Sequence, residues 1–243
     1  MDYSFLQCGE GALTVHLGDG IDPAINRRVT ALQAAIGSAG LRGITDLIPA
    51  YADLTVCYDC TVISAKALQR QLRRLLDSLS VAGQDRRRVF RLPVCYGGDY
   101  GPDLDFVCHH SGLSAQEVIA LHSQPDYLIY MLGFLPGFAY LGGLDPRLHT
   151  PRLDSPRTCI PAGSVGIGGA QTGVYPLASP GGWQLLGRTP VSVFDRQRQE
   201  PILYRAGDLV HFVPISPAEY EEIARAVAAG TYTVQVEEVP VCD

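Results

Sequence analysis

The residues best placed to do chemistry gather in one stretch rich in glycine and proline, Ile160 to Pro190. It contains eight glycines, four prolines, a single charged residue, Arg188, and the only tryptophan of the chain, Trp183. Glycine lets a backbone approach a neighbour closely, and proline favours tight turns. The composition predicts short strands joined by turns whose backbone N–H groups can bind an anion or an amide. A barrel corner in which the glycines only relieve crowding fits equally well.

His122 is the best acid/base candidate among six histidines. It closes a helix that begins with the capping box Ser114-x-x-Glu117, beside a predicted strand at 127–132. The alternative is a histidine that only complements the helix dipole. A metal site is not expected at the neighbours His109 and His110, because they cannot share one helix face, and no metal ligands are assigned elsewhere.

Phosphate-binding loops are missing from the sequence. No G-x-x-x-x-G-K-[ST] occurs, and the only lysine, Lys66, lies at the start of a predicted helix with no phosphate loop before it. Gly166-Ile-Gly168-Gly169 matches the dinucleotide-binding pattern only weakly, because it lacks the flanking strand and helix. A phosphate group is therefore expected to be bound elsewhere or at an unfamiliar kind of site.

Overall composition narrows the class of protein. The chain has 243 residues, 47% hydrophobic, with a net charge of −6. The acidic balance argues against nucleic-acid or anionic-membrane binding. No apolar run is long enough to span a bilayer, and the N-terminus lacks a signal peptide, so a cytoplasmic protein is expected. The seven cysteines, including Cys57 and Cys60 in a C-x-x-C, are expected to be free thiols.

The elements that must position these residues form two predicted domains. Residues 1–92 predict an α+β domain of the ferredoxin-like β-α-β-β-α-β pattern. Its strands are predicted at 12–17, 43–49, 53–58 and 89–96, with helices after Asp22-Pro23 and after Ser64. Residues 93–243 predict a mainly β barrel, because short strands alternate there with Gly/Pro turns. A C-terminal helix, opened by the capping box Ser216-x-x-Glu219, and a last strand at 232–236 complete it.

Long motifs in the second domain resemble a known family, allophanate hydrolase subunit 1. The resemblance rests on His122-Ser123, Leu132–Asp145 (LGFLPGFAYLGGLD), Thr150-Pro-Arg152, Pro161–Gly169 (PAGSVGIGG), Gln171–Pro176 (QTGVYP) and Ser179–Pro190 (SPGGWQLLGRTP). It covers roughly residues 3 to 215, and the extension after Pro217 has no role assigned by it. Members of this family include the kinase A inhibitor of sporulating bacteria and the B subunit of bacterial 5-oxoprolinase.

The resemblance implies a cyclophilin-like barrel and a role in a heteromeric complex. The implied activity is the ATP-dependent opening of 5-oxoproline to glutamate. The implied partners are an allophanate hydrolase subunit 2-type protein, which is the C subunit of 5-oxoprolinase, and a LamB/YcsF-type protein, which is its A subunit. Two alternatives stay open: an inhibitor of a sporulation-type histidine kinase, or the carboxyltransferase part of a urea carboxylase.

Side chains in and near the glycine-rich stretch are the candidate ligands for such a substrate: Arg157, Gln171, Tyr175, Gln184 and Arg188. An arginine fork suits a carboxylate, and glutamine amides can hold a lactam. Gln184 and Arg188 are four residues apart, so a regular strand would place them on the same face. Barrel scaffolding is the competing explanation for each. The aromatic residues Phe134, Phe138 and Tyr140 are expected in the core or at a partner interface.

Overall fold

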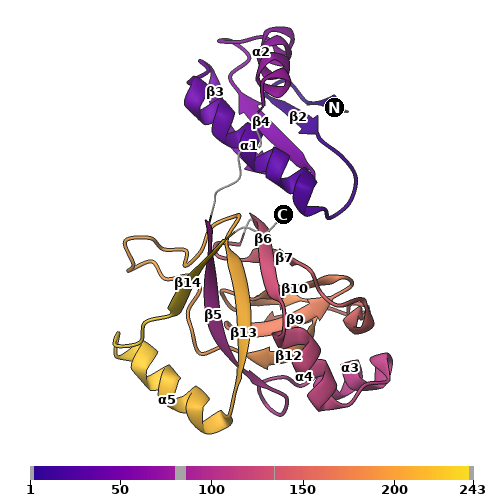
Figure 1. Ribbon diagram of the computed structural model, residues 1–243, viewed down its shortest axis with the longest axis vertical. Helices are drawn as coiled ribbons and strands as arrows, with labels where there is room; N and C mark the ends of the chain where they lie inside the picture. Colours follow the sequence, from indigo (N-terminus) through magenta and orange to yellow (C-terminus); the bar gives the residue numbers. More distant parts are fainter. Residues whose placement is uncertain (1–2, 80–85, 134, 241–243) are drawn as a thin grey trace. The chain divides into compact units, whose positions relative to one another are not determined.

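The computed structural model describes residues 3–79, 86–133 and 135–240, and the chain divides into two compact units (Figure 1). The first is Met1–Asp85 and the second is Arg86–Asp243. Each unit has its own sheet and its own hydrophobic core. The boundary predicted after residue 92 falls inside a strand of the second unit.

The first unit is one antiparallel sheet with two helices. The elements are β1 (Ser4–Cys8), β2 (Ala12–His16), α1 (Pro23–Ala39), β3 (Ile44–Pro49), β4 (Asp53–Tyr58) and α2 (Ala65–Asp77), and the strand order is β1-β2-β4-β3. Alternate residues of the central strands, such as Val15 and Val56, are fully buried with the leucine stripe of α2. The period-2 burial of the strands and the helical stripe thus form one core.

The ferredoxin-like pattern predicted for this unit is not confirmed. The strand that was to complete it, 89–96, lies in β5 (Arg86–Tyr96) and pairs with strands of the second unit. Its place is taken by β1, which the sequence did not reveal because four of its five residues are exposed. Successive residues of β5, such as Val89 and Phe90, are almost fully buried although they point to opposite faces of the strand. This is expected of a strand that is enclosed on both faces.

The second unit contains a closed β-barrel, so the prediction of a mainly β second domain is confirmed. Its other elements are α3 (Leu104–Ser111), α4 (Ala115–Ser123), β6 (Asp126–Leu132), β7 (Ala139–Gly142), the 3₁₀ turn η1 (Pro146–Leu148), β8 (Arg157–Ile160), β9 (Ser164–Gly168), β10 (Gln171–Val174), β11 (Ser179–Gly181), β12 (Gln184–Arg188), β13 (Leu209–Ile215), α5 (Pro217–Ala228) and β14 (Gln235–Pro240). Among the described residues, seven strands follow one another in the order β12-β9-β10-β7-β6-β13-β5. The ring closes where β12 pairs with β5, through Gly187 opposite Tyr96 and Arg188 opposite Cys95. The cyclophilin-like type of barrel stays a prediction.

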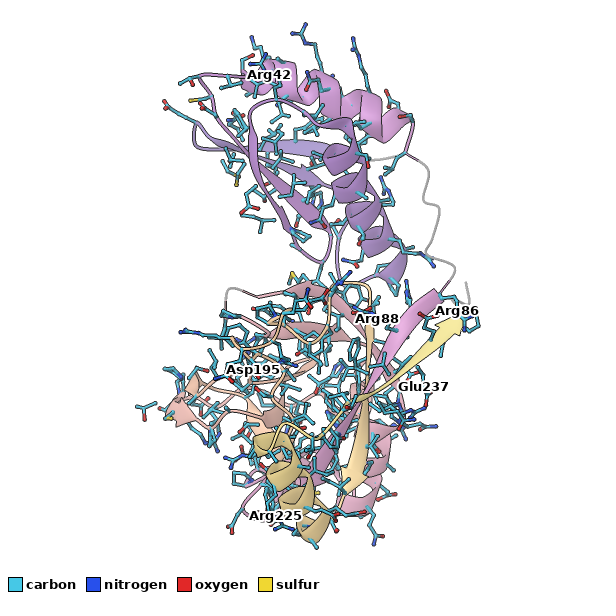
Figure 2. All side chains as sticks on the ribbon, turned by 90° about the vertical axis from the view of Figure 1, so that its left-hand side faces the viewer. Arg42, Arg86, Arg88, Asp195, Arg225 and Glu237 are labelled. Carbon is cyan, nitrogen blue, oxygen red and sulfur yellow. The ribbon has the colours of Figure 1, made fainter. Side chains whose placement is uncertain are left out.

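The C-terminal extension adds one strand to the outside of this ring. β14 pairs antiparallel with the first half of β5, from Gln235 opposite Arg91 to Pro240 opposite Arg86. Ion pairs reinforce the pairing of these two strands: Arg91 Nε lies 2.9 Å from Glu237 Oε1. Figure 2 shows Arg86 and Arg88 on β5 close to Glu237 on β14. The predicted C-terminal helix and strand are both present, although the strand begins three residues later than expected.

Candidate functional site: an aromatic cleft on the barrel unit

A cleft of about 540 Å³ opens on the second unit, and the sequence motifs line it. Its described lining residues are Gly133, Leu135, Phe138, Tyr140, Arg152, Tyr175, Ser179, Pro180, Gly181, Gly182 and Trp183. They come from three segments: the turn between β6 and β7 with the first half of β7, the loop after η1, and the run from the end of β10 through β11 to the start of β12. A cavity of this size suits a small organic molecule.

Four aromatic rings fix the shape of the cleft. Phe138 is central, with its ring centroid 5.3 Å from that of Tyr140, 5.6 Å from Tyr175 and 5.5 Å from Trp183, each in an edge-to-face arrangement. Such pairs stabilise a defined geometry beyond the area that they bury. Tyr175 and Trp183 form a buried cluster with Ile160 and Leu185, separate from the barrel interior, and Phe138 packs against it. The walls of the cleft are therefore held by their own small core.

Two glycines make room for the indole of Trp183. A Cβ placed on Gly168 would clash with the indole ring, lying 2.9 Å from its Cγ, and one on Gly173 would lie 3.2 Å from its Cζ3. Real Cβ atoms do not approach other carbons as closely as the first of these distances. The glycines of β9 and β10 are thus required by the close approach of Trp183.

Replacing Gly168 with alanine is expected to displace Trp183 and to destabilise the barrel unit by about 1–3 kcal/mol, the usual cost of overpacking. Thermal unfolding and the emission spectrum of Trp183 measure both effects. Gly182→Ala is the matched control, because its added Cβ would meet nothing nearer than 3.6 Å. Equal stability and equal emission in the two variants would contradict the packing argument.

Arg152 is the only cation among the described residues that line the cleft. Its guanidinium carbon lies 5.9 Å from the ring centroid of Trp183, at cation–π distance. Its Nη2 lies 3.4 Å from Gln171 Oε1 at the limit of a hydrogen bond. The side chain is otherwise exposed. A planar donor fork stacked on an aromatic wall is well suited to bind a carboxylate.

Three of the predicted ligands lie at or behind the cleft. Tyr175 lines it, and burial raises the pKa of its hydroxyl, so the group stays neutral. Gln171 contacts Arg152. Arg157 lies behind the wall, where its guanidinium binds Asp103 and the carbonyl oxygen of Trp183.

Gln184 and Arg188 do not share a face, so the prediction of a paired amide and guanidinium is wrong. A β-bulge between Leu185 and Gly187 shifts the register of β12 against β9. Gln184 pairs with Ile167 of the barrel interior, whereas Arg188 pairs with Ser164, three residues away and hence on the opposite face. Gln184 is buried and donates from Nε2 to the carbonyl oxygen of Pro151 at 3.0 Å. Arg188 instead hydrogen bonds with Tyr220 of α5.

His122 is fully buried in the barrel interior and does not line the cleft. The hydroxyl of Thr172 donates its one hydrogen to the Gly166 carbonyl oxygen. The Thr172 oxygen can therefore only accept in its bond with His122, so His122 Nε2–H is the donor, at 2.7 Å. Nδ1 then accepts from the hydroxyl of Tyr96 at 2.8 Å. Burial lowers the pKa of His122 from 6.5 to about 3, so the ring is neutral. These contacts fit a structural role better than a catalytic one.

The sequence did not predict that Arg152 and Trp183 form a pair in the cleft. Both stand in the quoted motifs, and Arg152 is the one cation of Thr150-Pro-Arg152, a signal that could have found it. Phe138 and Tyr140 were expected in the core or at an interface; Phe138 does pack against the aromatic cluster, and both residues also line the cleft. Phe134 lies outside the described residues.

No group of three potential metal ligands occurs within residues 3–79, 86–133 and 135–240. None of the helices there combines the length and the apolarity needed to cross a bilayer. The residues of the cleft do not form a familiar site for a nucleoside triphosphate, because the described lining offers one guanidinium and no glycine-rich loop that opens a helix.

Comparison with known proteins identifies the family. The chain is 42% identical to the B subunit of 5-oxoprolinase from Bacillus subtilis over 228 residues, 90% of this chain and 95% of that protein. It is 45% identical to the B subunit of 5-oxoprolinase from Escherichia coli O157:H7, over 85% of this chain and 93% of that protein. The fold matches the crystal structure of the Kluyveromyces lactis urea carboxylase, with a TM-score of 0.82 at 23% identity, over 98% of this chain and 24% of that one.

A family model agrees with these relatives. The model described as carboxyltransferase domain, subdomain C and D, matches residues 3–204. The resemblance inferred from the motifs is confirmed by the relatives named as 5-oxoprolinase B subunits. The chain therefore belongs to the family of the carboxyltransferase domain, subdomain C and D.

Proposed function

We propose that this chain is the B subunit of an ATP-dependent 5-oxoprolinase, a heteromeric hydrolase that opens 5-oxoproline to glutamate. Its support is the identity of 42% and 45% to proteins named as 5-oxoprolinase B subunits, over nearly their whole length. The observation that carries the site is the placement of Arg152 over Trp183 in a cleft built from the motif residues.

The cleft suits 5-oxoproline, a small lactam ring that carries a carboxylate. The guanidinium of Arg152 binds the carboxylate in a forked geometry. The rings of Trp183, Tyr175 and Phe138 contact the methylene edge of the substrate and exclude water from it. In this proposal the cleft binds and orients the lactam, whose C–N bond is then broken with addition of water.

The remaining chemistry belongs to partner proteins. Activation of an amide carbonyl needs ATP or an oxyanion site, and neither has an evident place among the described residues of the cleft. The partners are an allophanate hydrolase subunit 2-type protein, the C subunit, and a LamB/YcsF-type protein, the A subunit. In this proposal they bind ATP and supply the catalytic groups.

The purified chain alone is expected to release no glutamate from 5-oxoproline and ATP, because its cleft lacks an acid/base pair and a phosphate loop. The assay compares this chain, each partner alone, each pair and all three proteins together. Only the complete mixture is expected to be active. Sustained glutamate release by the single chain would contradict the proposal that partner proteins bind ATP and supply the catalytic groups. An inactive complete mixture would contradict the proposed reaction.

A second candidate is the carboxyltransferase part of a urea carboxylase system. Two observations favour it: the description of the matching family model and the fold shared with the K. lactis urea carboxylase. The test supplies the three-protein mixture with urea, bicarbonate, ATP and a separate protein that uses ATP to activate bicarbonate as the carboxyl donor. Carboxylation of urea without glutamate release from 5-oxoproline would select this candidate over the first.

A further inference from the structure

Two charged side chains lie behind the cleft and hold the segment that carries Trp183. Arg157 of β8 donates from Nη2 to Asp103 Oδ1 at 2.7 Å and from Nη1 to the Trp183 carbonyl oxygen at 3.2 Å. The other oxygen of Asp103 accepts from the Leu185 backbone N–H at 2.6 Å. Asp103 and Arg157 together therefore form hydrogen bonds with the backbone on both sides of Gln184.

Asp103 is diverted from the role that its position favours. It is the residue immediately before α3, where an aspartate normally accepts hydrogen bonds from the first turn of the helix. Its side chain makes no such bond here. Both carboxylate oxygens are instead directed at Arg157 and at the start of β12. The first turn of α3 therefore lacks a side-chain cap, and the start of β12 is held by a hydrogen bond to Asp103 instead.

Arg157 also connects the pair to β11, another part of the cleft lining. β8 forms a two-stranded ribbon with β11, in which Arg157 is opposite Gly181. The residues of β11, Ser179 to Gly181, all line the cleft. One ion pair therefore ties the ribbon, the Trp183 segment and the end of the barrel beside α3 together.

The surroundings of the pair strengthen it. The side chain of Asp103 is 12% exposed and that of Arg157 is 30% exposed. Charge-assisted hydrogen bonds in such partly dehydrated places are stronger than those of a solvated pair. Arg147 and Asp145 offer the comparison, because they form an ion pair of the same length, 2.7 Å, with Arg147 62% exposed.

We infer that Asp103 and Arg157 are positioning residues that preorganise the aromatic cleft by fixing the backbone of Trp183. Neither is among the described residues that line the cleft, so neither is expected to touch the substrate. The effect on catalysis rests on the proposed function, whereas the effect on Trp183 does not. Preorganised walls lower the ordering cost of binding.

The experiment uses Trp183 as its own reporter, because it is the only tryptophan of the chain. The variants are Arg157→Gln and Asp103→Asn, with Arg157→Lys as the conservative change and Arg147→Gln as the matched control. Acrylamide quenching and the emission maximum of the full-length chain report the exposure of the indole. Far-ultraviolet circular dichroism reports whether each variant keeps its fold, and kinetics of the assembled complex supply the KM for 5-oxoproline.

Arg157→Gln and Asp103→Asn are expected to increase the quenching constant about twofold or more and to raise KM about tenfold, the scale of one lost charged hydrogen bond, with kcat reduced less. Arg157→Lys is expected to be intermediate, since a single ammonium keeps the charge but not the fork that reaches both acceptors. Arg147→Gln is expected to leave both readouts unchanged.

Unchanged quenching in folded Arg157→Gln and Asp103→Asn variants would overturn the positioning role. If Arg157→Gln does not fold, Arg157→Lys and Asp103→Asn carry the same test. Increased quenching with an unchanged KM would support the positioning role and contradict substrate binding in the cleft. The two proposals can therefore fail separately.

Discussion

Replacing Arg152 with alanine is expected to raise the KM for 5-oxoproline in the assembled enzyme by roughly ten- to a hundredfold. That is the range for losing a charged hydrogen bond to a ligand carboxylate, about 1.5–3 kcal/mol. Arg152→Lys is expected to be nearly as damaging, because an ammonium supplies neither the fork nor the flat face that lies over Trp183. Stability is expected to change little, since Arg152 is exposed.

Steady-state kinetics of the complex assembled from the proposed partners test this expectation, with partner pull-down to show that each variant assembles. Arg147→Ala is the control, an exposed arginine that does not line the cleft. If Arg152→Ala and Arg152→Lys assemble and keep the kcat/KM of the wild type, the carboxylate of the substrate is bound elsewhere, on a partner protein.

Acid is expected to unfold the barrel unit in large part through His122. The pKa of this buried ring is lowered from 6.5 to about 3 in the folded chain, whereas the unfolded chain keeps the ordinary value. Between these pH values the unfolded state binds one more proton, so the free energy of unfolding falls as the pH falls from about 6.5 to about 3. The loss amounts to about 5 kcal/mol over the whole window.

The measurement is urea unfolding at several pH values from 7 to 4, followed by Trp183 fluorescence, for the wild type and His122→Gln. At pH 7 the variant is expected to be less stable by about 2–4 kcal/mol, because it disrupts the bonds to Tyr96 and Thr172. Its stability is expected to fall less steeply with acid than that of the wild type. The comparison cancels the carboxylates with lowered pKa values, such as Glu117. Parallel pH profiles would contradict a neutral buried His122.

Local patterns predicted much of the fold because their causes are local. Asp22, Ser64, Ser114 and Ser216 all cap helices as expected, since a cap depends on residues two or three positions away. The partner of a strand depends on distant residues instead. The run at 89–96 was correctly recognised as a strand, but nothing within it indicates that it pairs with β13, more than a hundred residues later.

The sequence indicated which region of the chain forms the site, but not how the side chains of that region are arranged. The motifs marked the stretch that lines the cleft, and Tyr175 was among the predicted ligands. The strand rule failed for Gln184 and Arg188 because a single bulged residue reverses the alternation of faces, and the spacing of side chains does not reveal it. Arg157 was recognised as important, but its partner Asp103 is 54 residues away.

The strand contributed by the extension after Pro217 has a consequence for how the chain behaves in solution. β14 occupies the side of β5 that β13 leaves open over residues 86–91. Without β14, this part of β5 would be an exposed sheet edge, with unpaired backbone N–H and C=O groups that could pair with a strand of another molecule. Such edges template intermolecular pairing and aggregation. β14 then forms the edge of the sheet itself. Its glutamates are paired with arginines of β5 and its last residue is Pro240, and charged residues and proline are features that make an edge strand a poor template for further pairing.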